Sequence, residues 1–138
     1  PQAGIIAKQL LEADPDSELV VDDFIVRYPT HTTDVAQAVC GLIEARLADA
    51  SLRGTFHWTG LERHTRYTIA ERIKTCWNLP GPALKPNPAQ GGGAPRPENA
   101  HLSRSRLEAL GVAVNEVTFA SALEKMLSPF APPRDNAV

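Results

Sequence analysis

The 138-residue sequence is poor in cysteine, with two residues, in methionine, with one, and in aromatic residues, at 6%. Cys40 and Cys76 lack CxxC or metal-ligand spacing, so we expect reduced, buried thiols, with a disulfide or a reactive thiol as alternatives. No apolar run is long enough to span a bilayer. The net charge is −2 and the pI is near 6.1, so the chain has no positive electrostatic field that would attract nucleic acid or an anionic membrane. We therefore expect a cytoplasmic protein without nucleic-acid or membrane partners.

Several motifs of known chemistry are also missing. The sequence has no HxxxH, HExxH or Cys/His cluster, which argues against a metal site. It has no GxSxG elbow, Walker sequence or GxGxxG fingerprint. Gly91–Gly93 lies in a proline-rich loop, which indicates a flexible linker. The chain starts at Pro1, its only methionine is Met126 and no signal peptide is visible, so we expect a processed chain or a fragment of a longer sequence.

The apolar pattern predicts an α/β fold in one domain over residues 1–130, with a frayed tail over 131–138. One long helix, capped by Thr32 or Thr33, has an apolar stripe at helical spacing, formed by Val35, Val39, Leu42, Ile43 and Leu47. The expected helices are 3–13, 32–48, 65–77, 103–111 and 118–127, and the expected short strands are 18–21, 55–59 and 84–86. Thr65 and Thr118 are the expected caps of the third and the last helix. The expected inward stripes of the first and the last helix are Ile5, Ile6, Leu10 and Leu11, and Ala122, Leu123, Met126 and Leu127. The strand at 55–59 has no hairpin mate, so we expect it to pair with strands supplied from elsewhere.

A first candidate site lies at the start of that long helix. Arg27 offers paired donors suited to phosphate or carboxylate. Thr30 and His31 precede a helix N-terminus, where backbone N–H groups favour an anion, and Asp34 falls in the first turn. The alternative is a loop arginine in a surface ion pair, with Thr32 only capping the helix.

A second candidate site lies before a short helix capped by Ser103. Pro95 and Pro97 flank Arg96 and lower the entropy lost when that side chain is held against a ligand. Asn99 follows closely, and its alternative role is to order the turn. Among the histidines, His57 reads as structural, and His64 and His101 are isolated in loops.

Five motifs in order carry a family resemblance: Arg27–Ala36 (RYPTHTTDVA), Gly54–Gly60 (GTFHWTG), Thr65–Ala70 (TRYTIA), Asn78–Pro80 (NLP) and Arg96–Leu102 (RPENAHL). Together they resemble the C-terminal half of extended short-chain dehydrogenase/reductases of the dTDP-4-dehydrorhamnose reductase branch. Within that branch the chain is most similar to regulatory β subunits of methionine adenosyltransferase. The Arg-aromatic-Pro-Thr-His, Gly-Thr-Phe-His-Trp and Arg-Pro-x-Asn-Ala-x-Leu patterns carry this closer likeness.

The resemblance implies a substrate-binding portion that includes the last strand of a Rossmann sheet, here 54–59, with the first Rossmann half absent. In sugar-nucleotide members, arginines matching Arg27 and Arg96 contact the substrate diphosphate. The implied substrate-binding residues are therefore Arg27, Thr30, His31, Arg96 and Asn99. The resemblance also implies NADP bound mainly by residues outside this chain, a possible nucleotide-sugar ligand, and the catalytic subunit of methionine adenosyltransferase as a partner.

The chain departs from the family pattern in one respect that bears on catalysis. It has no Tyr-x-x-x-Lys motif, because Thr32 lies four residues after Tyr28 and Glu71 lies four residues after Tyr67. We therefore expect no reductase activity from these residues alone. The leading interpretation is a fragment of a regulatory, NADP-binding subunit. The alternatives are the substrate lobe of a sugar-nucleotide reductase or epimerase, and a helix-rich domain without retained activity.

Overall fold

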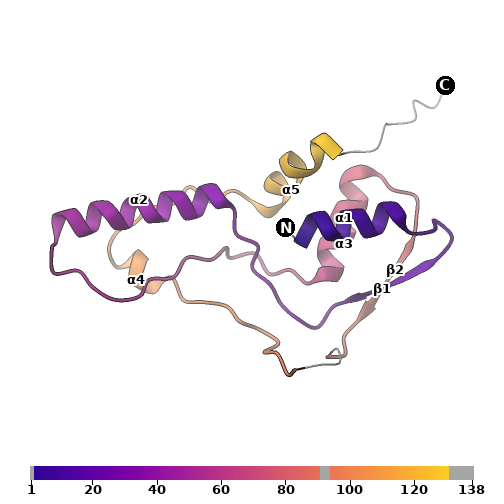
Figure 1. Ribbon diagram of the computed structural model, residues 1–138, viewed down its shortest axis with the longest axis horizontal. Helices are drawn as coiled ribbons and strands as arrows, with labels where there is room; N and C mark the ends of the chain where they lie inside the picture. Colours follow the sequence, from indigo (N-terminus) through magenta and orange to yellow (C-terminus); the bar gives the residue numbers. More distant parts are fainter. Residues whose placement is uncertain (1, 91–93, 131–138) are drawn as a thin grey trace.

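The computed structural model describes residues 2–90 and 94–130 and has the expected α/β architecture (Figure 1). The predicted linker at 91–93 and tail at 131–138 lie outside the described residues. In chain order the elements are α1 (Gln2–Glu12), β1 (Glu18–Asp22), α2 (Thr32–Ala48), α3 (Arg66–Trp77), β2 (Ala83–Asn87), α4 (Ser105–Glu108), α5 (Phe119–Leu127) and a 3-10 turn, η1 (Ser128–Phe130).

The two strands form a parallel pair and confirm the predicted strands at 18–21 and 84–86. Their register runs from Glu18 opposite Ala83 to Asp22 opposite Asn87. Parallel neighbours need a long crossover, and here the crossover contains both α2 and α3. Pro86 lacks an N–H, and a two-stranded sheet accommodates it because each strand has an outer edge.

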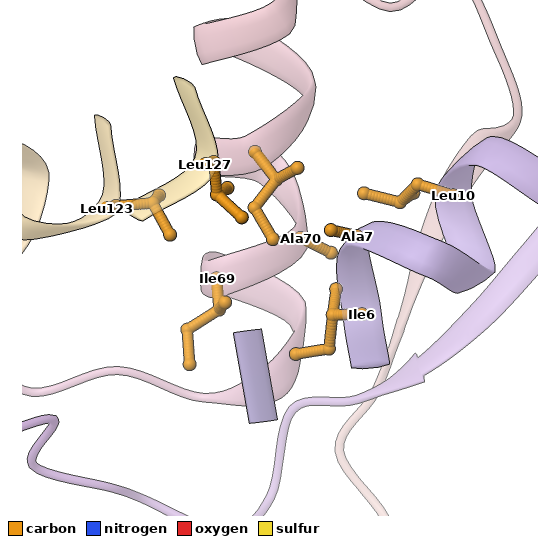
Figure 2. Close-up of a cluster of buried hydrophobic side chains, with 8 residues drawn as sticks. Ile6, Ala7, Leu10, Ile69, Ala70, Leu123 and Leu127 are labelled. Carbon is orange, nitrogen blue, oxygen red and sulfur yellow. The ribbon is translucent and has the colours of Figure 1, made fainter. Parts of the chain in front are cut away.

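The core lies where α1, α3 and α5 meet, on one side of the molecule (Figure 1). Figure 2 shows side chains of the three helices pointing toward one another. The buried cluster consists of Ile6, Ala7, Leu10, Ile69, Ala70, Ile73, Leu123 and Leu127. The expected inward stripes were partly wrong, because Ile5, Leu11 and Met126 are exposed. Helices α1 and α5 therefore bury narrower faces than their apolar spacing suggested.

Two of the predicted helix caps are confirmed and two are wrong. Thr65 forms a capping box with Thr68, and the Thr118 hydroxyl accepts a hydrogen bond from the Ser121 amide. Helix α2 is capped by His31 instead of Thr32 or Thr33. Helix α4 is a single turn that starts at Ser105, so its N-cap residue is Arg104 and not Ser103, although the Ser103 hydroxyl accepts from the Ser105 amide at 3.3 Å.

Helix α2 buries a different face from the one its apolar spacing predicts. The buried residues are Asp34 and Ala38, and this face lies against the loop at 112–117. The predicted stripe faces outward: Ile43 is 54% exposed and Leu47 is 81% exposed, and Val35 and Val39 are exposed as well. The stripe therefore has no cover among residues 2–90 and 94–130.

The strand expected at 54–59 does not form. These residues make no strand ladder in the part of the chain that the structure describes. A β-strand exists only through a paired neighbour, and the described residues provide none beside this segment. The expectation that the neighbour comes from elsewhere stays a prediction.

The cysteines also differ from expectation, because Cys40 and Cys76 are free but exposed. Cys40 is an exposed residue of α2, and Cys76 is one residue from the end of α3. Among the described helices, none combines the length and apolarity that crossing a membrane requires.

Candidate functional site

A pocket of about 640 Å³ lies between the loop before α2 and the helices α1, α3 and α5. Helices contribute an apolar wall, and the loop and one lysine contribute a polar rim. The wall includes Ala3, Ile69, Val117, Phe119, Ala122, Leu123 and Met126, and the rim includes Arg27, Tyr28, Thr30, His31 and Lys125. Three of the five predicted site residues, Arg27, Thr30 and His31, are therefore in one cavity.

Arg27 is half-buried and anchored within its own loop. Its Nη1 donates to Asp22 Oδ2 at 3.1 Å and to the Ile25 carbonyl at 2.7 Å. Partial burial favours a raised pKa for Asp22, but amide hydrogen bonds from Ile25 and Phe24 and the Arg27 guanidinium outweigh it, and the net pKa is lowered. This pair fixes the loop, so any ligand contact by Arg27 uses its remaining donors.

Thr30 connects two of the sequence motifs. Its hydroxyl donates to the Tyr28 carbonyl at 3.0 Å and accepts from the Gly60 amide at 3.0 Å. The glycine is required there, because a Cβ at position 60 would collide with the carbonyl of Pro29. Thr30 therefore joins the pocket loop to the GTFHWTG motif.

His31 and Asp34 fix the start of α2. His31 Nδ1 accepts from the Thr33 amide at 3.3 Å, so this nitrogen carries no proton in the cap. Asp34 is only 4% exposed, and its two carboxylate oxygens accept from the Val117 amide at 3.3 and 3.2 Å. Because Val117 lines the pocket, the hydrogen bonds to Asp34 attach this part of the pocket wall to α2.

The second predicted motif lies beside the first but outside the pocket lining. Asn99 forms a parallel bridge with Val26, and the Val26 amide donates to the Glu98 carbonyl at 2.8 Å. Two residues further along each segment, the rings of Tyr28 and His101 stack with centroids 3.9 Å apart. The backbone thus brings the two motifs side by side.

In the second motif, the Asn99 side chain bonds within its own turn and the Arg96 residue is exposed. Asn99 Oδ1 accepts from the His101 amide at 3.0 Å, which is the turn-ordering role weighed from the sequence. Arg96 is exposed, and its carbonyl accepts from Gln90 at 3.1 Å. Ligand contacts by Arg96 and Asn99 stay predictions.

His64 is the buried histidine nearest this site, at 8% exposure. Its backbone pairs with Arg27, and its ring packs on Phe119 with centroids 4.1 Å apart. Burial is the main cause that lowers the pKa of His64, and Arg72 adds to it, against the opposing effect of Glu62. The ring is therefore neutral near pH 7 and supports the wall formed by Phe119.

Sequence reasoning missed several residues of this site. Tyr28, Phe119 and Lys125 line the pocket, and His101 and His64 each stack on a lining ring. The aromatic residue inside the first motif was the one available signal. Lys125 carries no local signature, because a lysine on an amphipathic helix is ordinarily a solvated residue.

The arrangement is chemically a binding site. An apolar wall with arginine, histidine and lysine at its rim suits a ligand with an apolar or aromatic body and an anionic group. No cluster of three or more His, Cys, Asp or Glu side chains converges anywhere in 2–90 and 94–130. A dinucleotide cradle needs a glycine-rich turn between a strand and a helix. The segment from β1 to α2 contains no glycine, so this strand-to-helix connection does not fit the pyrophosphate of NADP.

Comparison with known proteins identifies the family. Residues 5–131 match the RmlD substrate binding domain. The chain belongs to this family, which confirms the resemblance drawn from the five motifs.

The curated relatives are β subunits. The chain is 42% identical over 112 residues to methionine adenosyltransferase 2 subunit beta of Danio rerio, covering 80% of this chain and 35% of the relative. The subunit of Mus musculus is 40% identical over 111 residues, with 80% and 33% covered. This chain thus spans about a third of the length of the curated relatives it matches.

Solved structures confirm the fold. A dTDP-4-dehydrorhamnose reductase of Bacillus anthracis, in complex with NADP, matches with a TM-score of 0.69 at 19% identity, over 93% of this chain and 42% of that one. A UDP-glucose 4-epimerase of Thermus thermophilus, complexed with NAD, matches with a TM-score of 0.62 at 25% identity, over 99% and 40%. The chain corresponds to the C-terminal, α/β part of such proteins.

Proposed function

We propose that this chain is the ligand-binding portion of a regulatory, NADP-binding subunit of methionine adenosyltransferase, and that it is not catalytic by itself. The observation that carries the proposal is the 40–42% identity to methionine adenosyltransferase 2 β subunits across four-fifths of the chain.

In this proposal the pocket rim holds the ligand and NADP is bound mainly by residues outside the chain. Arg27 and His31 supply cationic or donor groups at the rim, and Thr30 fixes the loop that carries them. Arg96 and Asn99 lie on the adjacent segment, and in this proposal they contact a part of the ligand that extends beyond the pocket. The partner would be the catalytic subunit, whose substrate affinity or stability changes on association.

The test is co-purification. A full-length protein that contains this chain, carrying an affinity tag, is expressed together with a methionine adenosyltransferase catalytic subunit. We expect a stable complex that survives size-exclusion chromatography. If the folded full-length protein elutes alone at micromolar concentrations of both partners, the regulatory proposal is wrong.

The second candidate is the substrate lobe of an NAD(P)-dependent sugar-nucleotide reductase or epimerase. The match to the NADP complex of a dTDP-4-dehydrorhamnose reductase, with a TM-score of 0.69, favours it. In that case the same full-length protein should reduce a dTDP-4-keto sugar with NADPH, through an acid and a lysine outside this chain. Turnover without association selects this candidate, and association without turnover selects the first.

A further inference from the structure

Two of the basic residues that line the pocket bring no net charge to it. Arg27 Nη1 lies 3.1 Å from Asp22 Oδ2, so the carboxylate offsets the charge of this guanidinium. His31 accepts the Thr33 amide at Nδ1, and a ring with one unprotonated nitrogen is the neutral form. Arg27 and His31 therefore offer hydrogen-bond donors to a ligand, and its negative charge is left for another residue to balance.

The remaining lining cation is Lys125, in the last turn of α5. Among residues 2–90 and 94–130, no carboxylate lies within ion-pair distance of its ammonium group. A cation beside an apolar wall attracts an anion more strongly than one in open water, because the local dielectric constant is lower. The pocket thus has one positive charge that is not offset by a neighbour.

Carboxylates flank the opposite end of the α5 wall. Glu62 Oε1 accepts from the Phe119 amide at 2.7 Å, at the first residue of the helix. The carboxylate of Asp34 accepts from the amide of Val117, two residues earlier. Because like charges repel, these groups disfavour an anion near Phe119.

Arg27 belongs to the Phe119 end. Its backbone pairs with that of His64, and the ring of His64 packs on Phe119. Lys125 follows Phe119 by six residues, which at about 1.5 Å per residue is about 9 Å along the helix axis. The pocket therefore has a polarity, with the compensated arginine toward one end and the uncompensated lysine toward the other.

We propose that Lys125 is the counter-ion of the ligand and that the pocket selects a singly charged amphipathic anion, such as an aryl or alkyl carboxylate. The anionic group lies at Lys125, and the apolar body lies along α5 between Ala122 and Phe119. A diphosphate would leave at least one buried charge without a cation, which is costly. The inference rests on the proposed function in one respect, that this pocket holds the ligand, and it names the class of that ligand.

The experiment uses a full-length protein that contains this chain and two fluorescent probes with the same aromatic body. Anilinonaphthalene sulfonate carries one negative charge, in which the sulfonate stands in for a carboxylate, and phenylnaphthylamine carries none. Lys125→Met should weaken binding of the sulfonate by about ten-fold and that of the neutral probe by less than about two-fold. An unchanged affinity for the sulfonate, or an equal loss for both probes, overturns the proposal.

Two matched variants separate the charge from its position. Lys125→Arg keeps the charge at the same place and should retain the sulfonate affinity to within about three-fold. Lys8→Met removes an exposed lysine of α1 that pairs with Glu12, outside the pocket lining, and should leave both affinities unchanged. If Lys8→Met weakens the sulfonate as much as Lys125→Met does, the effect belongs to the overall charge of the protein and the proposal is wrong.

A bulky substitution shows whether the probes occupy this pocket. Ala122→Phe places a ring in the cavity and should abolish binding of both probes, with folding checked by circular dichroism. Met126→Trp serves the same purpose at a more exposed position of the wall if the first variant does not fold. Unchanged binding of both probes by a folded variant places them elsewhere and overturns the proposal.

The charge count is tested by competition between naphthalene sulfonate and naphthyl phosphate. At about pH 8 the phosphate carries two charges, and the aromatic body is the same. We expect the sulfonate to displace the fluorescent probe at an equal or lower concentration than the phosphate. Tighter binding of the phosphate by about ten-fold or more contradicts a single cation. No measurement here involves a catalytic subunit, so a failure leaves the co-purification test of the regulatory proposal intact.

Discussion

Replacing Asp34 tests how the pocket wall is attached to α2. Both carboxylate oxygens accept from the Val117 amide, and the carboxylate lies in the first turn of a 17-residue helix. Losing a buried, charge-assisted hydrogen bond costs about 1.5–2 kcal/mol, and losing the favourable interaction with the helix N-terminus adds about 0.3–1 kcal/mol. Asp34→Ala should therefore lower the free energy of unfolding by about 2–3 kcal/mol.

Urea denaturation followed by circular dichroism measures this loss, with the fluorescence of Trp58 and Trp77 as local reporters. Asp34→Asn retains one acceptor oxygen without the charge, so its loss should be about half as large. The control is Glu44→Ala, an exposed residue of the same helix, which should change the free energy by less than about 0.5 kcal/mol. An Asp34→Ala loss no greater than that of the control would refute the reasoning.

Four further outcomes are expected. Ile73→Ala should cost about 2–5 kcal/mol in urea denaturation, because Ile73 is fully buried in the core; a loss below about 1 kcal/mol would contradict that packing. Gly60→Ala should cost about 1–3 kcal/mol, because its Cβ meets the Pro29 carbonyl, and an unchanged midpoint would rule out the close approach. Burial holds the pKa of His64 below its ordinary 6.5, so the neutral ring contributes stability above that pH and the contribution is lost as the pH falls. His64→Gln should therefore reduce the loss of unfolding free energy at acid pH. If the stability of the variant falls with pH as steeply as that of the original protein, another group is responsible. In the full-length protein, Arg96→Ala should weaken nucleotide-sugar or regulatory-ligand binding by about 1.5–3 kcal/mol without changing stability, and calorimetry showing unaltered affinity would remove Arg96 from the site.

Much of the fold could be predicted because its signals are local. Thr65 and Thr118 cap helices through their own first turns, and helical spacing located α1, α3 and α5 to within a few residues. The buried faces of the helices were harder to predict. The outward stripe of α2 and the missing strand at 54–59 were predicted wrongly for the same reason. Apolar spacing identifies a surface that can be buried, but it does not show which segment buries it.

The candidate site was predictable in outline and not in detail. The family resemblance implied one ligand for Arg27 and Arg96, and the Val26–Asn99 bridge shows that the two segments lie side by side. The local engagement of Arg27 with Asp22 and of Thr30 with Gly60 depends on contacts five and thirty residues apart. The spacing of residues along one sequence carries no information on such pairings. From the sequence alone, the donors of Arg27 and Thr30 are therefore expected to be available for a ligand.

The hydrophobic cluster joins helices from near residue 6, from the middle of the chain and from near residue 127 (Figure 2). During synthesis on the ribosome, Ile69 and Ile73 are made more than fifty residues before Leu127. The apolar surface of α3 that α5 covers therefore stays exposed on the nascent chain for about fifty residues of elongation. At ordinary translation rates this takes several seconds. This domain should depend on chaperone protection at that stage more than one whose core closes from adjacent segments.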